Sequence, residues 1–127
     1  MRHYFCHLSP VEKWRWMGMR VRLSLFPCEP RLLDQYLTTG RWLHANTDYP
    51  LWQMAHTTAN LLLTTAADPS LPLYWRSLCL DHIYQPLDQM VRIVKGESQQ
   101  RQLAELRFKL VRLDITPADD TASGAAD

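Results

Sequence analysis

An uncharged stretch from Tyr49 to Ala67, bounded by Asp48 and Asp68, constrains the fold more than any other part of this chain. Asp48 can cap the first turn of a helix, and Pro50 fits that turn because its missing N–H has no helical partner there. Apolar side chains at three- and four-residue spacing cover more than one face of such a helix. The stretch therefore predicts a central helix, residues 49–67, with neighbouring elements on at least two sides.

A line of polar side chains runs along the same predicted helix. Gln53, His56 and Asn60 follow one another at three- or four-residue steps, and Thr64 continues the line. This polarity argues against a membrane span, which requires about 20 predominantly apolar residues, so we expect no membrane association. We interpret the line as the wet face of the helix, because amphipathic helices ordinarily have one. The alternative is that Gln53, His56 and Asn60 line a pocket for a small polar ligand.

The N-terminal region fits two secondary structures. Ser9-Pro10-Val11-Glu12 has the form of a capping box with proline at the first helical position, which predicts a helix continuing through Met17. From Met19 to Leu25, apolar residues alternate with polar ones as they do in a strand. We favour the helix, because no second alternating segment is present to pair with a lone strand. A short β-hairpin from His3 to Leu25 is the alternative.

Two further segments have helical patterns. A short helix is predicted from Arg31 to Thr39, ended by Gly40 as a C-cap and followed by a connection from Arg41 to Thr47. After the central helix, an apolar segment from Leu71 to Tyr84 meets Pro86, which interrupts the backbone hydrogen bonds. This segment therefore forms either one kinked helix or two abutting helices.

The last predicted helix follows Gly96 and has Ser98 as its cap. Four leucines form one seam along it: Leu103, Leu106, Leu110 and Leu113. Because only two heptads are covered, we favour packing against the chain's own core over a homodimer through this seam. Pro117 to Asp127 is acidic and nearly without apolar residues, so we predict a disordered tail after a single helical domain, residues 1–116. The fold class is all-α, a compact bundle of five or six helices around residues 49–67.

Composition indicates a globular cytoplasmic protein. The 127 residues match one domain of ordinary size, and 46% hydrophobic residues suffice for a core without disulfides. The three cysteines are far apart and odd in number, which is typical of a reducing compartment. The N-terminus lacks the uninterrupted apolar core of a secretory signal. Arg outnumbers Lys eleven to three, which favours a bacterial source.

Motifs for catalysis and cofactor binding are missing from the sequence. Acidic residues are sparse and suggest no general acid–base pair, and neither glycine-rich phosphate-binding motif occurs. His3, Cys6 and His7 offer three zinc ligands without a dependable fourth. We therefore expect a protein that is not an enzyme, with no cofactor and no metal site.

The basic and aromatic segment K-W-R-W-M-G-M-R-V-R, residues 13–22, is the most distinctive polar feature. Trp and Arg are enriched at protein-binding hot spots, whereas Arg and Lys also neutralise phosphates and Trp stacks on bases. Our leading hypothesis is a small helical protein that binds another macromolecule as an accessory, chaperone-like or regulatory subunit. The expected partner is a protein. A nucleic-acid-binding regulator is the alternative. The candidate residues for both are Lys13, Trp14, Arg15, Trp16, Arg20 and Arg22.

Overall fold

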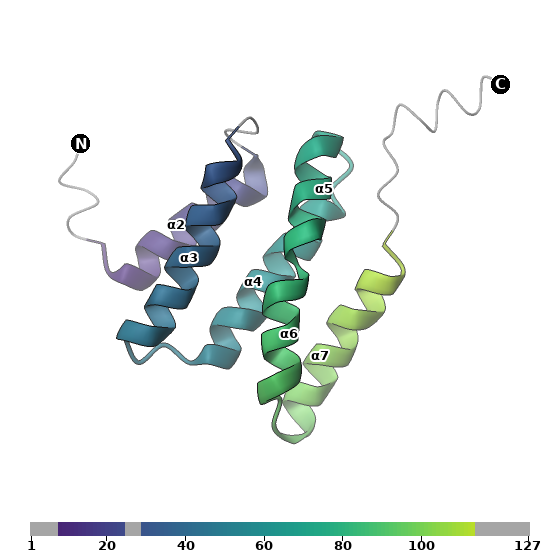
Figure 1. Cartoon of the computed structure of the whole chain (residues 1–127). Helices are drawn as coiled ribbons and strands as arrows, with labels where there is room; N and C mark the ends of the chain where they lie inside the picture. Colours follow the sequence, from purple (N-terminus) through teal and green to yellow (C-terminus); the bar gives the residue numbers. More distant parts are fainter. Residues whose placement is uncertain (1–7, 25–28, 114–127) are drawn as a thin grey trace.

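The described part of the chain, residues 8–24 and 29–113, forms an all-α bundle in the computed structural model (Figure 1). No strand occurs in these residues. The helices are α2 (Pro10–Leu23), α3 (Pro30–Asn46), α4 (Leu51–Ala66), α5 (Leu73–His82), α6 (Tyr84–Ile93) and α7 (Gly96–Val111). The predicted fold class is confirmed. The predicted acidic tail, residues 117–127, lies outside the described residues.

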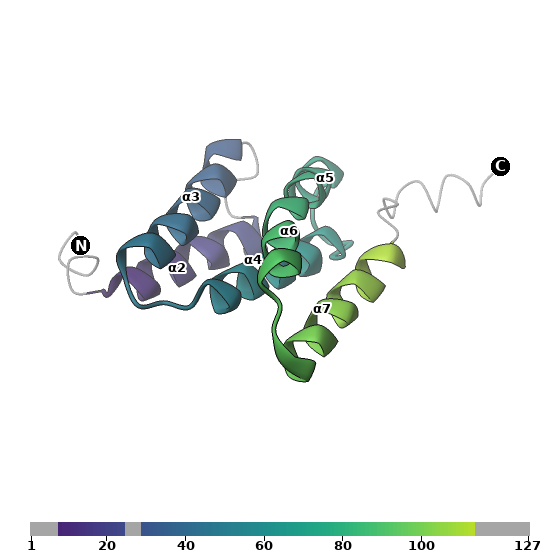
Figure 2. The ribbon, with the colours of Figure 1, turned by 60° about the horizontal axis from the view of Figure 1, so that its bottom comes forward.

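Helix α4 is the centre of the bundle, as the uncharged stretch predicts. It contacts each of the other helices, with α2 and α3 on one side and α5, α6 and α7 on the other (Figures 1 and 2). Even its buried threonines are satisfied, because the Thr58 and Thr65 hydroxyls donate to the carbonyls of Met54 and Leu61 one turn earlier, at 2.8 and 2.7 Å. The predicted cap is wrong, since Pro50 precedes the first turn and Asp48 makes no capping bond.

Helix α2 settles the ambiguity of the N-terminal region over the described residues. The predicted capping box is present, with the Ser9 N–H donating to the Glu12 carboxylate at 2.8 Å and the Glu12 N–H donating to the Ser9 hydroxyl at 3.2 Å. The helix then continues to Leu23, so the strand-like alternation after Met19 does not form a hairpin. Residues 1–7 lie outside the described part of the chain.

Helix α3 is longer than predicted. Gly40 lies inside it rather than at its C-cap, and the predicted connection from Arg41 to Thr47 is mostly helical. The physical reason is a close approach, because a Cβ at Gly40 would lie 3.0 Å from the Trp14 indole nitrogen and 3.3 Å from the Met54 sulfur. Glycine is used here to let α2 pack closely on α3, not to end a helix.

The segment around Pro86 forms two abutting helices rather than one kinked helix. Ile83 serves as the C-cap of α5 and precedes the first residue of α6. Pro86 falls in the first turn of α6, where its missing N–H has no helical partner. Its buried ring therefore contributes to the core without breaking a hydrogen bond.

Helix α7 begins two residues before the predicted cap, Ser98, which makes no capping bond. The Lys95 N–H instead donates to the Gln99 side-chain carbonyl at 2.8 Å. Two leucines of the predicted seam, Leu103 and Leu106, are buried in the chain's own core, whereas Leu110 and Leu113 are only partly buried. The four leucines therefore cannot together form a homodimer contact without opening this core.

Candidate protein-binding surfaces

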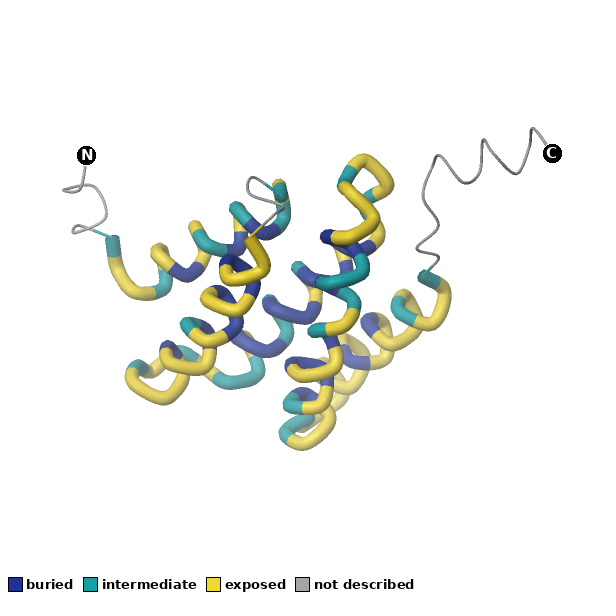
Figure 3. Tube along the Cα trace, turned by 45° about the horizontal axis from the view of Figure 1, so that its top comes forward, coloured by how far each residue is buried: buried dark blue, intermediate teal, exposed yellow. Residues whose placement is uncertain are grey.

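The side of α2 that faces away from the bundle carries an apolar line. Trp16, Met19 and Leu23 lie at spacings of three and four residues, and 45%, 52% and 52% of their surfaces are exposed. The opposite side of the same helix is buried through Trp14, Gly18 and Val21. We call Trp16, Met19 and Leu23 the outer line of α2. Figure 3 shows buried and exposed residues alternating along the helices of the bundle. Because a solvated helix face is ordinarily polar, the exposed outer line of α2 is an apolar feature that the core does not explain.

Trp14 is the one residue of the predicted binding set that belongs to the core, which corrects the prediction for this side chain. It is fully buried, its ring stacks on Tyr36 at 5.4 Å between centroids, and its indole N–H donates to the Tyr36 carbonyl at 3.2 Å. Since residues two apart on a helix point in nearly opposite directions, α2 cannot present Trp14 and Trp16 to one partner.

The four predicted bases lie on the flanks of the outer line of α2. Lys13 and Arg15 are exposed, and Arg20 is half-buried and engaged in an interaction of its own. Arg22 forms an ion pair with Asp68, with Nη1 and Oδ2 2.8 Å apart, which ties α2 to the end of α4. The structure thus leaves Lys13 and Arg15 as the exposed cations beside the apolar line.

Asp68 is stabilised as a carboxylate by three bonds. The Ser70 hydroxyl and N–H donate to Oδ1 at 2.6 and 3.0 Å, and Arg22 donates to Oδ2. The Ser70 hydroxyl contributes most, followed by Arg22, and together these bonds lower the pKa of Asp68 to about 2. Because the folded pKa lies below the usual value of about 3.9 in an unfolded chain, ionised Asp68 favours the folded state.

We expect Asp68→Asn to remove a stabilisation that depends on pH. The Asp68 contribution is complete above about pH 5 and is lost as the pH falls toward 2, first because the carboxylate of the unfolded chain takes up a proton and then because the folded carboxylate does. Since the pair is partly exposed, the difference in unfolding free energy at pH 6 should be about 1 kcal/mol. Urea denaturation at several pH values measures it. Arg22→Gln should retain part of the pH dependence through Ser70, and equal profiles for Asp68→Asn and the intact chain would contradict the assignment.

The predicted polar stripe of α4 lies at the surface beside two open hollows. Gln53 and His56 border one of about 530 Å³, formed with the start of α7, and His56 and Asn60 border another of about 480 Å³. The His56 ring stacks on Trp52, whose indole N–H donates to Gln102 at 2.9 Å. Gln53 and Asn60 are exposed, as expected of a wet face, and the ligand-pocket hypothesis remains a prediction.

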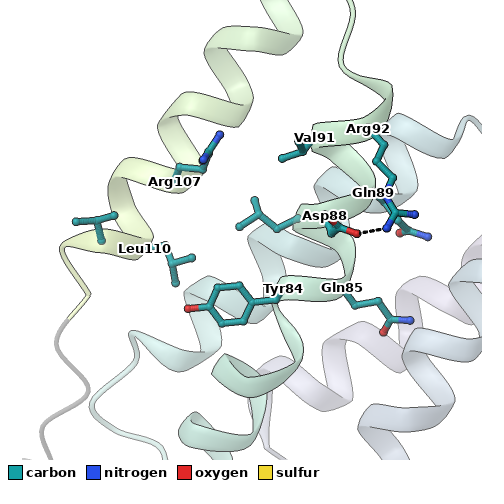
Figure 4. Close-up of a pocket in the computed structure, with 10 residues that line it drawn as sticks. Tyr84, Gln85, Asp88, Gln89, Val91, Arg92, Arg107 and Leu110 are labelled. Atoms are coloured by element: carbon teal, nitrogen blue, oxygen red, sulfur yellow. Dashed lines mark ion pairs between the residues drawn. The ribbon is translucent and has the colours of Figure 1, made fainter.

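A groove between α6 and α7 is a surface that sequence reasoning missed. Its volume is about 930 Å³, and Figure 4 shows side chains from both helices facing it. Asp88 and Arg92 form an ion pair at 2.7 Å along its α6 side. On the α7 side, Val111 is 84% exposed, and Phe108, which follows the lining residue Arg107 in the sequence, is 61% exposed. The apolar lining residues are Tyr84, Leu87, Val91, Leu110 and Val111.

One side of this groove could have been predicted from the sequence. The spacing of Tyr84, Leu87 and Val91 places all three on one face of α6. The placement of α7 relative to α6, which leaves a groove between the two helices, is not encoded in any local pattern. We find no group of three or more metal-ligating side chains in residues 8–24 and 29–113. The helices of this same part of the chain are too short or too polar to cross a membrane.

Comparison with known proteins adds no family assignment. The chain matches no family model, no curated protein and no solved structure.

Proposed function

We propose that this is a small cytoplasmic helical protein, without catalytic activity, that binds another protein as an accessory, chaperone-like or regulatory subunit. The supporting observation is the outer line of α2, where Trp16, Met19 and Leu23 are about half exposed directly opposite the buried side of the helix. Exposed apolar side chains that gather on one face of a helix are typical of interaction sites. Trp16 beside Arg15 also supplies two of the three residue types that are most enriched at binding hot spots.

A nucleic-acid partner is less well supported by the same helix. Stacking on unpaired bases requires exposed aromatic rings, and Trp14 is buried. Arg22 is paired with Asp68, which leaves fewer cations for phosphates. Met19 and Leu23 would also lie against the charged backbone of the nucleic acid, where apolar side chains gain little. Steep weakening of oligonucleotide binding with salt is the expected signature of this alternative.

The proposal is tested by affinity capture from a lysate of the source organism. We expect the intact chain to retain a specific protein that a Trp16→Ser/Leu23→Ser variant loses, because the two substitutions remove apolar contact area at both ends of the outer line of α2. Quantitative mass spectrometry of the captured proteins measures the loss. Since both side chains are half exposed, circular dichroism should show that the variant keeps its helical fold.

Trp42→Ser is the matched control. Trp42 is 50% exposed, comparable to Trp16, but it lies on α3. The Trp42→Ser variant should capture the same protein as the intact chain, in the same amount. A captured set that is identical for the intact chain and the Trp16→Ser/Leu23→Ser variant would refute binding through α2, and binding of a single-stranded oligonucleotide at low salt that this variant loses would favour the alternative.

A further inference from the structure

We infer that the outer face of α2 binds an amphipathic helix whose apolar stripe is flanked by acidic residues. This inference rests on the proposed function and specifies the chemistry of the partner. Three features of α2 carry it: the position of its apolar residues, the sign of the charges beside them, and the bonding of its central backbone groups within the helix.

The apolar residues of the outer line follow the axis of α2. A helix turns by 100° per residue, so Trp16, Met19 and Leu23 fall within about 60° of one another, centred opposite Trp14, Gly18 and Val21. Their spacing over two turns is the spacing at which one helix packs its side chains against another. The line therefore fits a partner element that is itself straight over two turns and apolar along one side.

The charges beside the outer line are basic on both sides. Lys13 and Arg20 follow one flank, and Arg15 and Arg22 follow the other. The single acid of α2, Glu12, lies one turn before Trp16 at the start of the helix, where its carboxylate accepts the Ser9 N–H in the capping box, which lowers its pKa. It is outnumbered by the four bases that follow it. Even with Arg22 paired to Asp68, exposed Lys13 and Arg15 remain on opposite flanks. A complementary partner places carboxylates on both sides of its own apolar stripe.

The backbone of α2 explains why the partner should be a helix. Between its first and last turns, the N–H and C=O groups of α2 are bonded to one another, as in any α-helix, so this part of the face offers an extended peptide no row of backbone partners. An extended chain pressed against apolar side chains would leave its own backbone groups unpaired, whereas a helix satisfies them internally. An acidic amphipathic helix thus meets the apolar line and both basic flanks without unpaired backbone groups.

The test uses the full chain and fluorescent synthetic peptides about 18 residues long, sufficient to form a helix. One peptide has leucines at three- and four-residue spacing flanked by glutamates, and its matched partner has lysines in place of the glutamates. We expect fluorescence anisotropy to show binding of the acidic peptide only. Its affinity should fall about tenfold or more for the Lys13→Glu/Arg15→Glu variant and for the Trp16→Ser/Leu23→Ser variant.

The control for net charge is Arg101→Glu/Arg107→Glu, which changes two exposed bases on α7, on the other side of α4 from α2 (Figure 2). It should bind the acidic peptide as the intact chain does. Equal binding of the two peptides, or equal losses for both charge-reversal variants, overturns the inference. Loss of lysate capture for Trp16→Ser/Leu23→Ser without any binding of the acidic peptide also overturns it, while leaving the proposed function standing.

Discussion

Replacing Trp14 by alanine should lower the unfolding free energy by about 3–5 kcal/mol, the usual range for removing a large aromatic side chain from a core. The substitution removes the stack on Tyr36 and the hydrogen bond from the indole to the Tyr36 carbonyl. It also leaves a cavity beside Gly40, whose missing Cβ makes room for this ring. Urea denaturation followed by circular dichroism measures the change.

Trp16→Ala provides the internal control, since it removes the same side chain two residues further along the same helix. Because Trp16 is 45% exposed and lies outside the core, its loss should change the unfolding free energy by no more than about 1 kcal/mol. Similar destabilisation by Trp14→Ala and Trp16→Ala would mean that α2 does not bury the side that carries Trp14.

Trp75→Ala should be comparably destabilising, by about 3–5 kcal/mol. Trp75 is fully buried on α5, and its indole N–H donates to the Val21 carbonyl at 2.9 Å, near the C-terminus of α2. The substitution therefore removes both core volume and a bond that joins two helices far apart in the sequence. Thermal denaturation should show a loss of about 10 °C or more.

Trp75→Phe separates these two contributions. It keeps most of the packing and removes the donor, and the Val21 carbonyl still accepts the Ser24 N–H at 3.1 Å. The expected loss is roughly 1–2 kcal/mol, because the acceptor is not left unpaired. A phenylalanine variant as unstable as the alanine variant would show that the hydrogen bond, rather than the packing, holds α5 against α2.

The central helix could be predicted because a charge-free stretch with apolar residues on several sides is stable only when other elements surround it. The role of Gly40, in contrast, could not be predicted from the sequence. A glycine after a short amphipathic pattern is a common helix end, and only the position of Trp14 against α3 shows that this one permits close packing. The distinction depends on a contact between residues 26 positions apart, which local patterns do not contain.

The candidate site could be predicted only in part, because local patterns do not contain contacts between distant residues. The segment from Lys13 to Arg22 was identified by composition, and the outer line of α2 lies within it or directly after it. Composition could not show that Trp14 is buried and Trp16 exposed, because this difference depends on which side of the helix meets α3. The groove between α6 and α7 depends on how far two helices diverge, so residue types alone could not reveal it.

The central place of α4 has a consequence for the order in which the chain can fold during synthesis. Helices α2 and α3 leave the ribosome before α4 and can pair through Trp14 and Tyr36. Their remaining apolar surfaces have no cover until α4 has followed. The apolar surfaces of α2 and α3 in the nascent chain therefore stay partly exposed until α4 has been synthesised. A pause in translation before Ala66 would prolong their exposure to chaperones and proteases.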